Sequence, residues 1–416
     1  MGTVENKTFL TTSPFLYPMP DTAVEFSSCR TRIVIVLSIG LFIIFTGILS
    51  LIPMLPAISN DFNISETMLG VIMGSFMVFM AFPQIPIGVL SDRYGRRPFI
   101  TGGILIFSFG LLFFGEARSE SQLLIARSLS GFGAAMFFST AYTIVNDIYS
   151  IRERGKGMGI ISMTVGLGTV CGYIMGGVVG GIYGWRAVFI YMFWASLIIS
   201  GSTLLLIETS PRTQEHDFGI KKMASATLVI FRDKTIVLAS IVSMLCGIAV
   251  VGASYTFSFF ASDIVSPVEM GFIFIPYAIT SSLGASITGF LSDRIGRKKP
   301  LTVMTVLGGA ALIIFAFVTP GPLMMAIIFG FVGLSLGPVV TLTTTILADV
   351  VVKKDVRILG SSIGAFNMVR WTGTAIGPVI AGYIMQLAGT RLSFLVLALF
   401  ILLSCVVSIF IRETLD

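Results

Sequence analysis

The stretch GVLSDRYGRR at residues 88–97 recurs as GFLSDRIGRK at residues 289–298, 201 residues later. A second stretch, GTVCGYIMGG at 168–177, recurs as GTAIGPVIAG at 373–382, 205 residues later. Matches at a nearly constant offset indicate that the chain contains two copies of one structural unit.

The composition indicates that both copies lie in a lipid bilayer. The chain has 416 residues, of which 55% are hydrophobic and only 12% charged, and its mean hydropathy is +0.95. Soluble domains carry about 25% charged residues. The charge-free stretches 33–60, 157–185 and 235–262 each exceed the roughly 20 apolar residues that a helix needs to cross a bilayer. A soluble enzyme is therefore excluded.

Apolar stretches predict an all-α polytopic membrane protein with twelve transmembrane helices in two six-helix bundles. The turn sequence TPGP at 319–322 divides the long charge-free segment 300–348 into two spans. Because each unit has an even number of spans, both units enter the membrane in the same direction, and a pseudo-two-fold axis relates them. The predicted spans are 33–52, 67–90, 99–115, 122–146, 157–182 and 187–207, then 235–260, 268–291, 301–318, 323–348, 358–385 and 392–411.

The expected domains are a cytoplasmic N-terminal tail (1–32), an N-terminal bundle (33–207), a cytoplasmic linker (208–234) and a C-terminal bundle (235–416). All but five of the 27 Lys and Arg residues fall on the side of the two termini and the linker. Short cytoplasmic loops carry the Lys/Arg excess, so both termini are expected in the cytoplasm. The net charge of +6 follows from this bias, and no nucleic-acid partner is expected. Residues 220–234 are interpreted either as an amphipathic segment on the inner leaflet or as a solvated linker.

Cysteine and histidine give no sign of catalysis. Cys29, Cys171, Cys246 and Cys405 are scattered, without the spacing of a zinc site or a disulfide framework, and His216 is the single histidine. No cofactor, metal ion or catalytic residue is expected.

The doubled loop, G-x-x-x-D-R-x-G-R-[RK], resembles the signature of the major facilitator superfamily, in its twelve-helix drug:proton antiporter branch. The resemblance covers essentially the whole chain after the N-terminal tail. It implies a secondary active transporter of the plasma membrane, with a small-molecule substrate, for which a monomer suffices. It also implies a cytoplasmic latch that holds the two halves together when the cavity faces outward. The latch residues are Gly88, Asp92, Arg93, Arg96 and Asp147, and in the second copy Gly289, Asp293, Arg294, Arg297 and Asp349.

Two further stretches resemble family motifs. Arg127 begins a match to R-x-x-Q-G-x-G-x-A in which Ser130 replaces the glutamine. An arginine inside a span is costly unless it faces a cavity or a partner, so Arg127 is a cavity candidate, and the alternative is a side chain that snorkels outward. The glycine-rich fifth span resembles G-x-x-x-G-P-x-x-G-G, with Tyr173 in place of proline. Glycines four apart permit close helix packing, either against span 8 or as general packing, and the candidates are Gly168, Gly172, Gly176, Gly373, Gly377 and Pro378.

Arg370 lies about a dozen residues into span 11, or roughly 18 Å from its cytoplasmic end at 1.5 Å per residue. With Asn367 and Trp371 it is interpreted as an anion-accepting or cation–π patch, or alternatively as a residue paired with backbone carbonyls. The resemblance places spans 1, 4, 7 and 10 around a central cavity. Further cavity candidates on these and neighbouring spans are Phe42, Phe45, Gln84, Phe138, Tyr142, Tyr255, Phe259, Tyr277, Thr341 and Thr345.

These features favour an exporter of small amphipathic or drug-like compounds that works by alternating access. Proton antiport is what the resemblance implies, yet no acidic residue lies in the middle of a predicted span. Either a peripheral carboxylate carries the proton, or coupling is to something else. The alternatives are a transporter of organic anions or lipid-like amphiphiles, not necessarily proton-coupled, and a membrane enzyme or sensor without transport.

Overall fold

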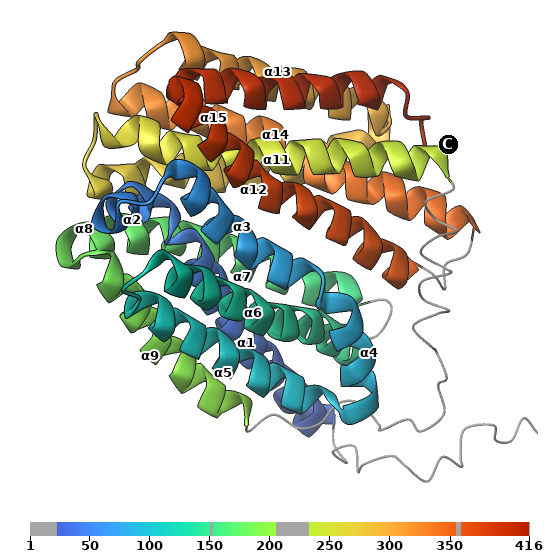
Figure 1. The fold of residues 1–416 in the computed structure, drawn as a ribbon. Helices are drawn as coiled ribbons and strands as arrows, with labels where there is room; N and C mark the ends of the chain where they lie inside the picture. Colours follow the sequence, from blue (N-terminus) through green and yellow to red (C-terminus); the bar gives the residue numbers. More distant parts are fainter. Residues whose placement is uncertain (1–22, 150–152, 205–232, 355–358, 416) are drawn as a thin grey trace, which may run out of the picture.

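The computed structural model describes residues 23–149, 153–204, 233–354 and 359–415. These residues form helices joined by short turns, and none of them lies in a strand (Figure 1). Most of the predicted tail and linker lie outside the described residues. The helices are α1 (Ala23–Leu49), η1 (Ile52–Met54), α2 (Leu55–Phe62), α3 (Glu66–Ala81), α4 (Gln84–Tyr94), α5 (Arg96–Gly115), α6 (Glu120–Ile148), α7 (Arg154–Ile174), η2 (Met175–Val179), α8 (Gly180–Tyr183), α9 (Trp185–Thr203), α11 (Lys234–Ser262), α12 (Pro267–Ile295), α13 (Lys298–Phe317), α14 (Pro322–Lys354) and α15 (Leu359–Ile409).

The helices account for twelve membrane crossings. Ten segments of the described chain are long and apolar enough to span a bilayer, and the bent pair of α3 and α4 forms an eleventh. Helix α15 has 51 residues and non-helical backbone at Gly389. A single crossing needs only about 20 residues, so α15 makes two crossings. The prediction of an all-helical membrane protein is confirmed, and the structure is consistent with its twelve spans.

The backbone repeats the symmetry of the sequence. Gly95 and Gly296, 201 residues apart, have φ/ψ of 97°/156° and 91°/163°, and each ends the helix that carries an Asp/Arg motif. Gly184 and Gly389, 205 residues apart, have 85°/157° and 82°/175°. A positive φ strains every residue that has a Cβ atom, so these turns require glycine. Equal backbone geometry at the offsets of the repeats shows that the two halves are copies of one fold.

The two ends of the bundle differ in charge. One end, called here the basic end, carries the start of α1, the turn from α4 to α5, the turn from α12 to α13, and the C-terminal residues (Figure 1). The other end, called here the opposite end, carries the starts of α3 and α12.

Two helix starts at the opposite end are capped by serines. Ser65 accepts a hydrogen bond from the backbone N–H of Met68, and Ser266 forms a capping box with Glu269. Such caps satisfy the free N–H groups of a helix start and fix where each helix begins.

Candidate functional site

A cavity of about 310 Å³ lies between the two halves. Its volume falls at the small end of the range of roughly 300–1,000 Å³ that is usual for small-molecule sites. Three of the predicted cavity residues, Phe45, Tyr277 and Trp371, line it. The other lining residues are Ile48, Leu49, Ile52, Met73, Met77, Met80, Ser162, Val165, Gly166, Thr169, Tyr173, Val250, Val251, Ser254, Ala278, Ser281 and Ser282.

The cavity wall is mainly apolar and carries no charged side chain among the described residues that line it. Three methionines of α3, Met73, Met77 and Met80, form one side, and their unbranched thioethers adapt to ligands of varied shape. Hydroxyl groups from α7, α11 and α12 provide the scattered polar contacts. This wall suits a mostly apolar molecule with few hydrogen-bonding groups.

An aromatic row of α1 and α6 begins at the cavity, and Arg370, which is not itself part of the wall, lies next to the lining residue Trp371. The ring centroid of Phe45 is 6.1 Å from that of Phe138, which is 4.5 Å from that of Tyr142. The guanidinium carbon of Arg370 is 5.1 Å from the ring centroid of Trp371. Predicted residues from α1, α6 and α15 therefore meet beside one cavity.

Arg127 lies elsewhere in the first half, away from the cavity lining. Its side chain is only 2% exposed, and its guanidinium carbon is 5.0 Å from the Phe76 ring centroid and 5.4 Å from that of Phe114. Its Nε and Nη1 atoms have no hydrogen-bond partner among the described residues. Arg127 is thus held by aromatic faces inside the helix packing of α3, α5 and α6.

The remaining cavity candidates lie along the inter-helix contacts. Tyr255 donates a hydrogen bond to the carbonyl oxygen of Glu66 at 2.6 Å, and Phe259 packs against its ring. The carbonyl of Gln84 accepts a hydrogen bond from Ser139 at 3.4 Å. The others are the half-buried Phe42, Thr341, Thr345 and Asn367, which are not part of the cavity wall.

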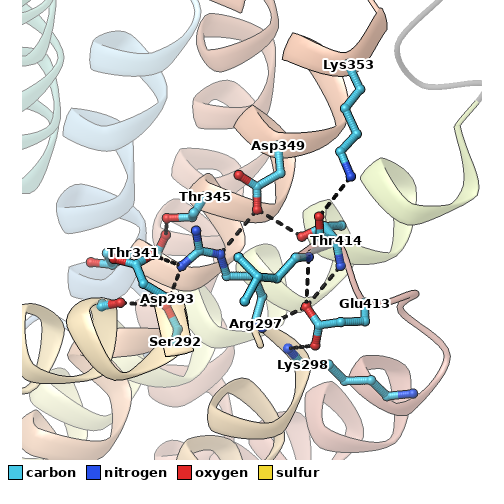
Figure 2. Close-up of polar contacts among 12 residues, drawn as sticks. Ser292, Asp293, Arg297, Lys298, Thr341, Thr345, Asp349, Lys353, Glu413 and Thr414 are labelled. Atoms are coloured by element: carbon cyan, nitrogen blue, oxygen red, sulfur yellow. Dashed lines mark hydrogen bonds and ion pairs between the residues drawn. The ribbon is translucent and has the colours of Figure 1, made fainter. Parts of the chain in front are cut away.

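The two Asp/Arg motifs form matching ion-pair clusters, each within its own half. Arg96 is 3.0 Å from Asp92 and 2.6 Å from Asp147. In the second half, Arg297 pairs with Asp293 and lies 3.2 Å from Asp349 (Figure 2). Both arginines are buried, so each ion-pair cluster is part of the helix packing of its own half.

The other latch residues also repeat between the halves. Arg93 and Arg294 are exposed, and each lies over a ring of its own helix, that of Tyr94 or Phe290. A Cβ atom on Gly88 would lie 3.9 Å from the hydroxyl oxygen of Ser139, and one on Gly289 would lie 3.9 Å from the methyl group of Thr341. The two glycines therefore lie at equal distance from the helix that carries the cluster aspartate, α6 or α14.

The second cluster contains C-terminal residues that the sequence did not assign to it. The Glu413 carboxylate accepts hydrogen bonds from the backbone N–H groups of Arg297 at 2.8 Å and Lys298 at 3.1 Å. Thr414 donates to Asp349, and Lys353 donates to the carbonyl of Thr414 (Figure 2). One repeat in the sequence does point to these residues, because Glu208–Thr209 recurs as Glu413–Thr414 at the offset of 205. The first of the two pairs, Glu208–Thr209, lies outside the described residues.

These contacts shift two pKa values. Burial acts to raise the pKa of Glu413, but four backbone N–H donors stabilise its charged form and leave the pKa below its usual value. Burial acts to lower the pKa of Arg297, but hydrogen bonds and charge attraction from Asp293 and Asp349 raise it overall. Both groups are therefore charged at neutral pH.

The predicted packing glycines lie against neighbouring helices of their own half. Gly168 and Gly172 face α1, and a Cβ atom on either would approach the backbone of Phe42 or Thr46 too closely. Gly176 faces the carbonyl of Ser50 in the same way. In the second half, Gly373 faces Met244 and Gly377 faces Ile248, both on α11. The glycine that contacts span 8 (α12) is instead their neighbour Gly177, which lies against Gly271.

The two halves are in direct contact at the opposite end. Gly70 lies against the carbonyl of Pro378, and Gly382 lies against the carbonyl of Glu66, too close in both cases for a Cβ atom. Three hydrogen bonds join the halves there: Tyr255 to Glu66, Thr67 to Gln386 at 2.7 Å, and Ser258 to the carbonyl of Ile52 at 2.8 Å. These contacts close the space between the halves at this end.

Comparison with known proteins identifies the family of this chain. The profile of the Major Facilitator Superfamily matches residues 37–264 and 239–415. Multidrug resistance protein 2 of Bacillus subtilis (strain 168) is 24% identical over 370 residues, which cover 86% of this chain and 90% of that protein. Multidrug resistance protein 1 of the same organism is 27% identical over 370 residues, with coverages of 85% and 89%.

Solved structures agree with the fold. A bacterial homolog of the human lysosomal transporter Spinster, in an inward-facing and occupied conformation, superposes with a TM-score of 0.77 at 19% identity, covering 92% of this chain and 96% of that one. The nucleoside transporter NupG superposes with a TM-score of 0.73 at 16% identity, with coverages of 92% and 98%. The chain is a multi-pass membrane transporter, not an enzyme; it belongs to the major facilitator superfamily, and its Bacillus relatives support the drug-transporter branch.

Proposed function

We propose that this transporter exports small amphipathic compounds across the plasma membrane by alternating access. The observation that carries this proposal is an apolar cavity between two symmetric halves, which meet at the opposite end through small residues and a few hydrogen bonds. Relative rotation of two such halves exposes a shared cavity to each side in turn. One chain encloses the whole cavity, so a monomer suffices.

The basic end faces the cytoplasm in this proposal, and so do both termini. Arginines and lysines gather in the turns of that end, as in the cytoplasmic loops of other membrane proteins. The contacts of the opposite end would then close the cavity toward the outside, and a compound would enter it from the cytoplasm.

The two Asp/Arg clusters, in this scheme, are halves of a latch that is open here. Each arginine pairs with carboxylates of its own half. Figure 1 shows α4, which carries Asp92 of the first cluster, well apart from the C-terminal end of the chain, which contributes Glu413 and Thr414 to the second. Approach of the clusters would close the basic end. A transporter needs two such states within a few kcal/mol, so that both remain populated.

Proton antiport is the proposed source of energy. The acidic residues of the described spans lie within about two turns of a helix end. The proton carrier is therefore a carboxylate close to a membrane face, with Asp147 and Asp349 as candidates because they lie near the ends of the equivalent helices α6 and α14 and pair with the cluster arginines.

Transport into proteoliposomes tests the proposal. The purified protein is reconstituted with an acidic lumen, and the uptake of a series of labelled amphipathic compounds is followed with and without the pH gradient. We expect saturable uptake of at least one compound, accelerated by the gradient. Uptake that a gradient does not change would remove proton coupling alone, whereas no protein-dependent flux of any amphiphile would refute the exporter.

A further inference from the structure

We propose that the cavity binds an amphipathic organic anion, with its carboxylate or a similar acidic group held between Arg370 and Trp371. This inference rests on the proposed function, since it names the class of compound that the central cavity takes. The apolar body of the anion would lie along the methionine side of the cavity wall, against Met73, Met77 and Met80.

Arg370 provides a positive charge that lacks a counterion among the described residues. It lies near the first third of the long helical segment from Leu359 to the break at Gly389, inside the membrane. Its guanidinium carbon lies 5.1 Å from the Trp371 ring centroid, and no ion pair joins it to a carboxylate of the described residues. A charge at this depth is costly unless it is paired or faces a polar cavity. An anionic ligand would supply the missing partner.

Trp371 provides a second unsatisfied donor at the same place. Its ring lines the cavity, while its indole Nε1 is buried without a hydrogen-bond partner among the described residues. A buried N–H group without an acceptor loses the hydrogen bond that it would make in water. A carboxylate oxygen next to Arg370 would accept from this group as well, and the guanidinium fork can bind both oxygens of such a group.

The rest of the cavity does not favour the opposite charge. The described residues of its lining include no Asp or Glu side chain that would attract a cation. Arg370, which lies against the lining residue Trp371, repels cations and attracts anions. Aromatic faces alone would bind a cation weakly in comparison with a paired charge.

The position of Arg370 connects ligand binding to the movement of the halves. The methionine side of the wall lies on α3 of the first half, whereas Arg370 and Trp371 lie on α15 of the second. An anion held at Arg370, with its apolar body against those methionines, would therefore contact both halves and change the balance of charge at their interface. A ligand shifts a conformational equilibrium only through such differential contacts.

A matched set of ligands tests the charge preference. The probes are 4-phenylbutyrate, 4-phenylbutanol and 4-phenylbutylammonium, which share one apolar body and differ in charge. Their binding to the purified full-length protein in phosphatidylcholine nanodiscs is measured by calorimetry. We expect the anion to bind at least tenfold more tightly than the alcohol, and the cation to bind most weakly.

Variants assign the preference to named groups. Arg370→Gln should weaken binding of the anion by roughly 10- to 100-fold, the range for a lost charge-assisted hydrogen bond, and should leave binding of the alcohol nearly unchanged. Arg370→Lys should retain part of the preference, and Trp371→Phe, which keeps a ring but removes the N–H, should weaken anion binding severalfold. Arg391→Gln removes the same charge at an exposed site of the opposite end and serves as the control.

The source of the anion is distinguished by the lipid. If added phosphatidylglycerol competes with 4-phenylbutyrate, the site takes a lipid headgroup, and if it does not compete, the site takes free organic acids. Tighter binding of the cation or the alcohol to the wild type, binding of none of the three probes, or an anion affinity that Arg370→Gln leaves intact would each overturn the inference. If such a protein still transports other amphiphiles in proteoliposomes, the proposed exporter stands and only the anion site fails.

Discussion

The two ends of the bundle are built from different interactions. At the opposite end, the halves meet through glycines such as Gly70 and Gly382, whose missing Cβ atoms allow backbone-to-backbone contact. At the basic end, the ion pairs around Arg96 and Arg297 each stay within one half. One end is thus closed by close packing between halves, while the charges of the other end stabilise each half separately.

This difference has a physical basis. Close packing needs precise shape and little desolvation, so it can form and separate without stranding a charge. Ion pairs that are partly buried lose much more when one partner is removed, because the remaining charge stays unpaired. We therefore expect substitutions in the clusters to affect the stability of the halves, and substitutions at the glycine contacts to affect the balance between states.

The largest expected effect follows loss of a cluster arginine. Arg96→Ala and Arg297→Ala should each lower the free energy of unfolding by about 3 kcal/mol, because each leaves two carboxylates without their cation. Thermal unfolding of the purified protein measures the loss. The exposed Arg294→Ala is the control, and it should cost less than about 1 kcal/mol. Equal losses in all three variants would show that burial of the clustered charge is not the cause.

A Cβ atom at the glycine contact should disturb the packing between the halves at the opposite end. Gly382→Ala places a methyl group against the carbonyl of Glu66, and such overpacking costs typically about 1–3 kcal/mol. The outward-open state, in which the contact is separated, should gain population, as seen by labelling of a cysteine introduced at residue 67. Gly364→Ala, on the same helix with open space around it, is the matched control. Equal labelling of the two variants would contradict the account.

A single hydrogen bond between the halves should have a smaller effect. Tyr255→Phe removes the donor to the carbonyl of Glu66 and should destabilise the contact between the halves at the opposite end by about 1 kcal/mol. The same labelling experiment reads this change as a modest rise in accessibility. Tyr383→Phe, at an exposed tyrosine of α15, should change nothing. A Tyr255→Phe protein that labels like the wild type would remove this bond from the closing contacts.

The smallest effect concerns Glu413 and depends on pH. Because folding lowers the pKa of Glu413, its stabilisation is present above the unfolded value of about 4.3 and is lost as the pH falls through the folded value. Glu413 is exposed, so the advantage of the wild type over Glu413→Gln should be below about 1 kcal/mol at pH 7. Unfolding midpoints at pH 7 and pH 4 measure both proteins. A difference that grows toward acidic pH would have the wrong sign.

The sequence predicted the fold because its main signals are local and repeated. The doubled Asp/Arg motif shows the duplication, and charge-free stretches mark the spans to within a few residues of α5, α11 and α13. The ion pairs of Arg96 and Arg297 also join residues that the repeats had already singled out.

The cavity wall was harder to predict, and the reason is the uniform composition of the spans. In a helix that is apolar on all sides, no periodicity tells which face points to lipid and which to the cavity. Met73, Met77 and Met80 of α3 were therefore missed, and Arg127 was expected at the cavity although it lies among aromatic rings of α3 and α5. Rotation of a helix about its axis is set by tertiary packing, which one sequence does not display.

Cross-linking the closed end tests alternating access most directly. In a background without the four native cysteines, Thr67→Cys and Gln386→Cys are joined by a short reversible thiol reagent, since their side chains are hydrogen-bonded at 2.7 Å in the closed end. Alternating access predicts that the cross-linked protein binds its compound but does not transport it, and that a reductant restores transport. Transport at the full rate while the two residues remain joined would contradict it.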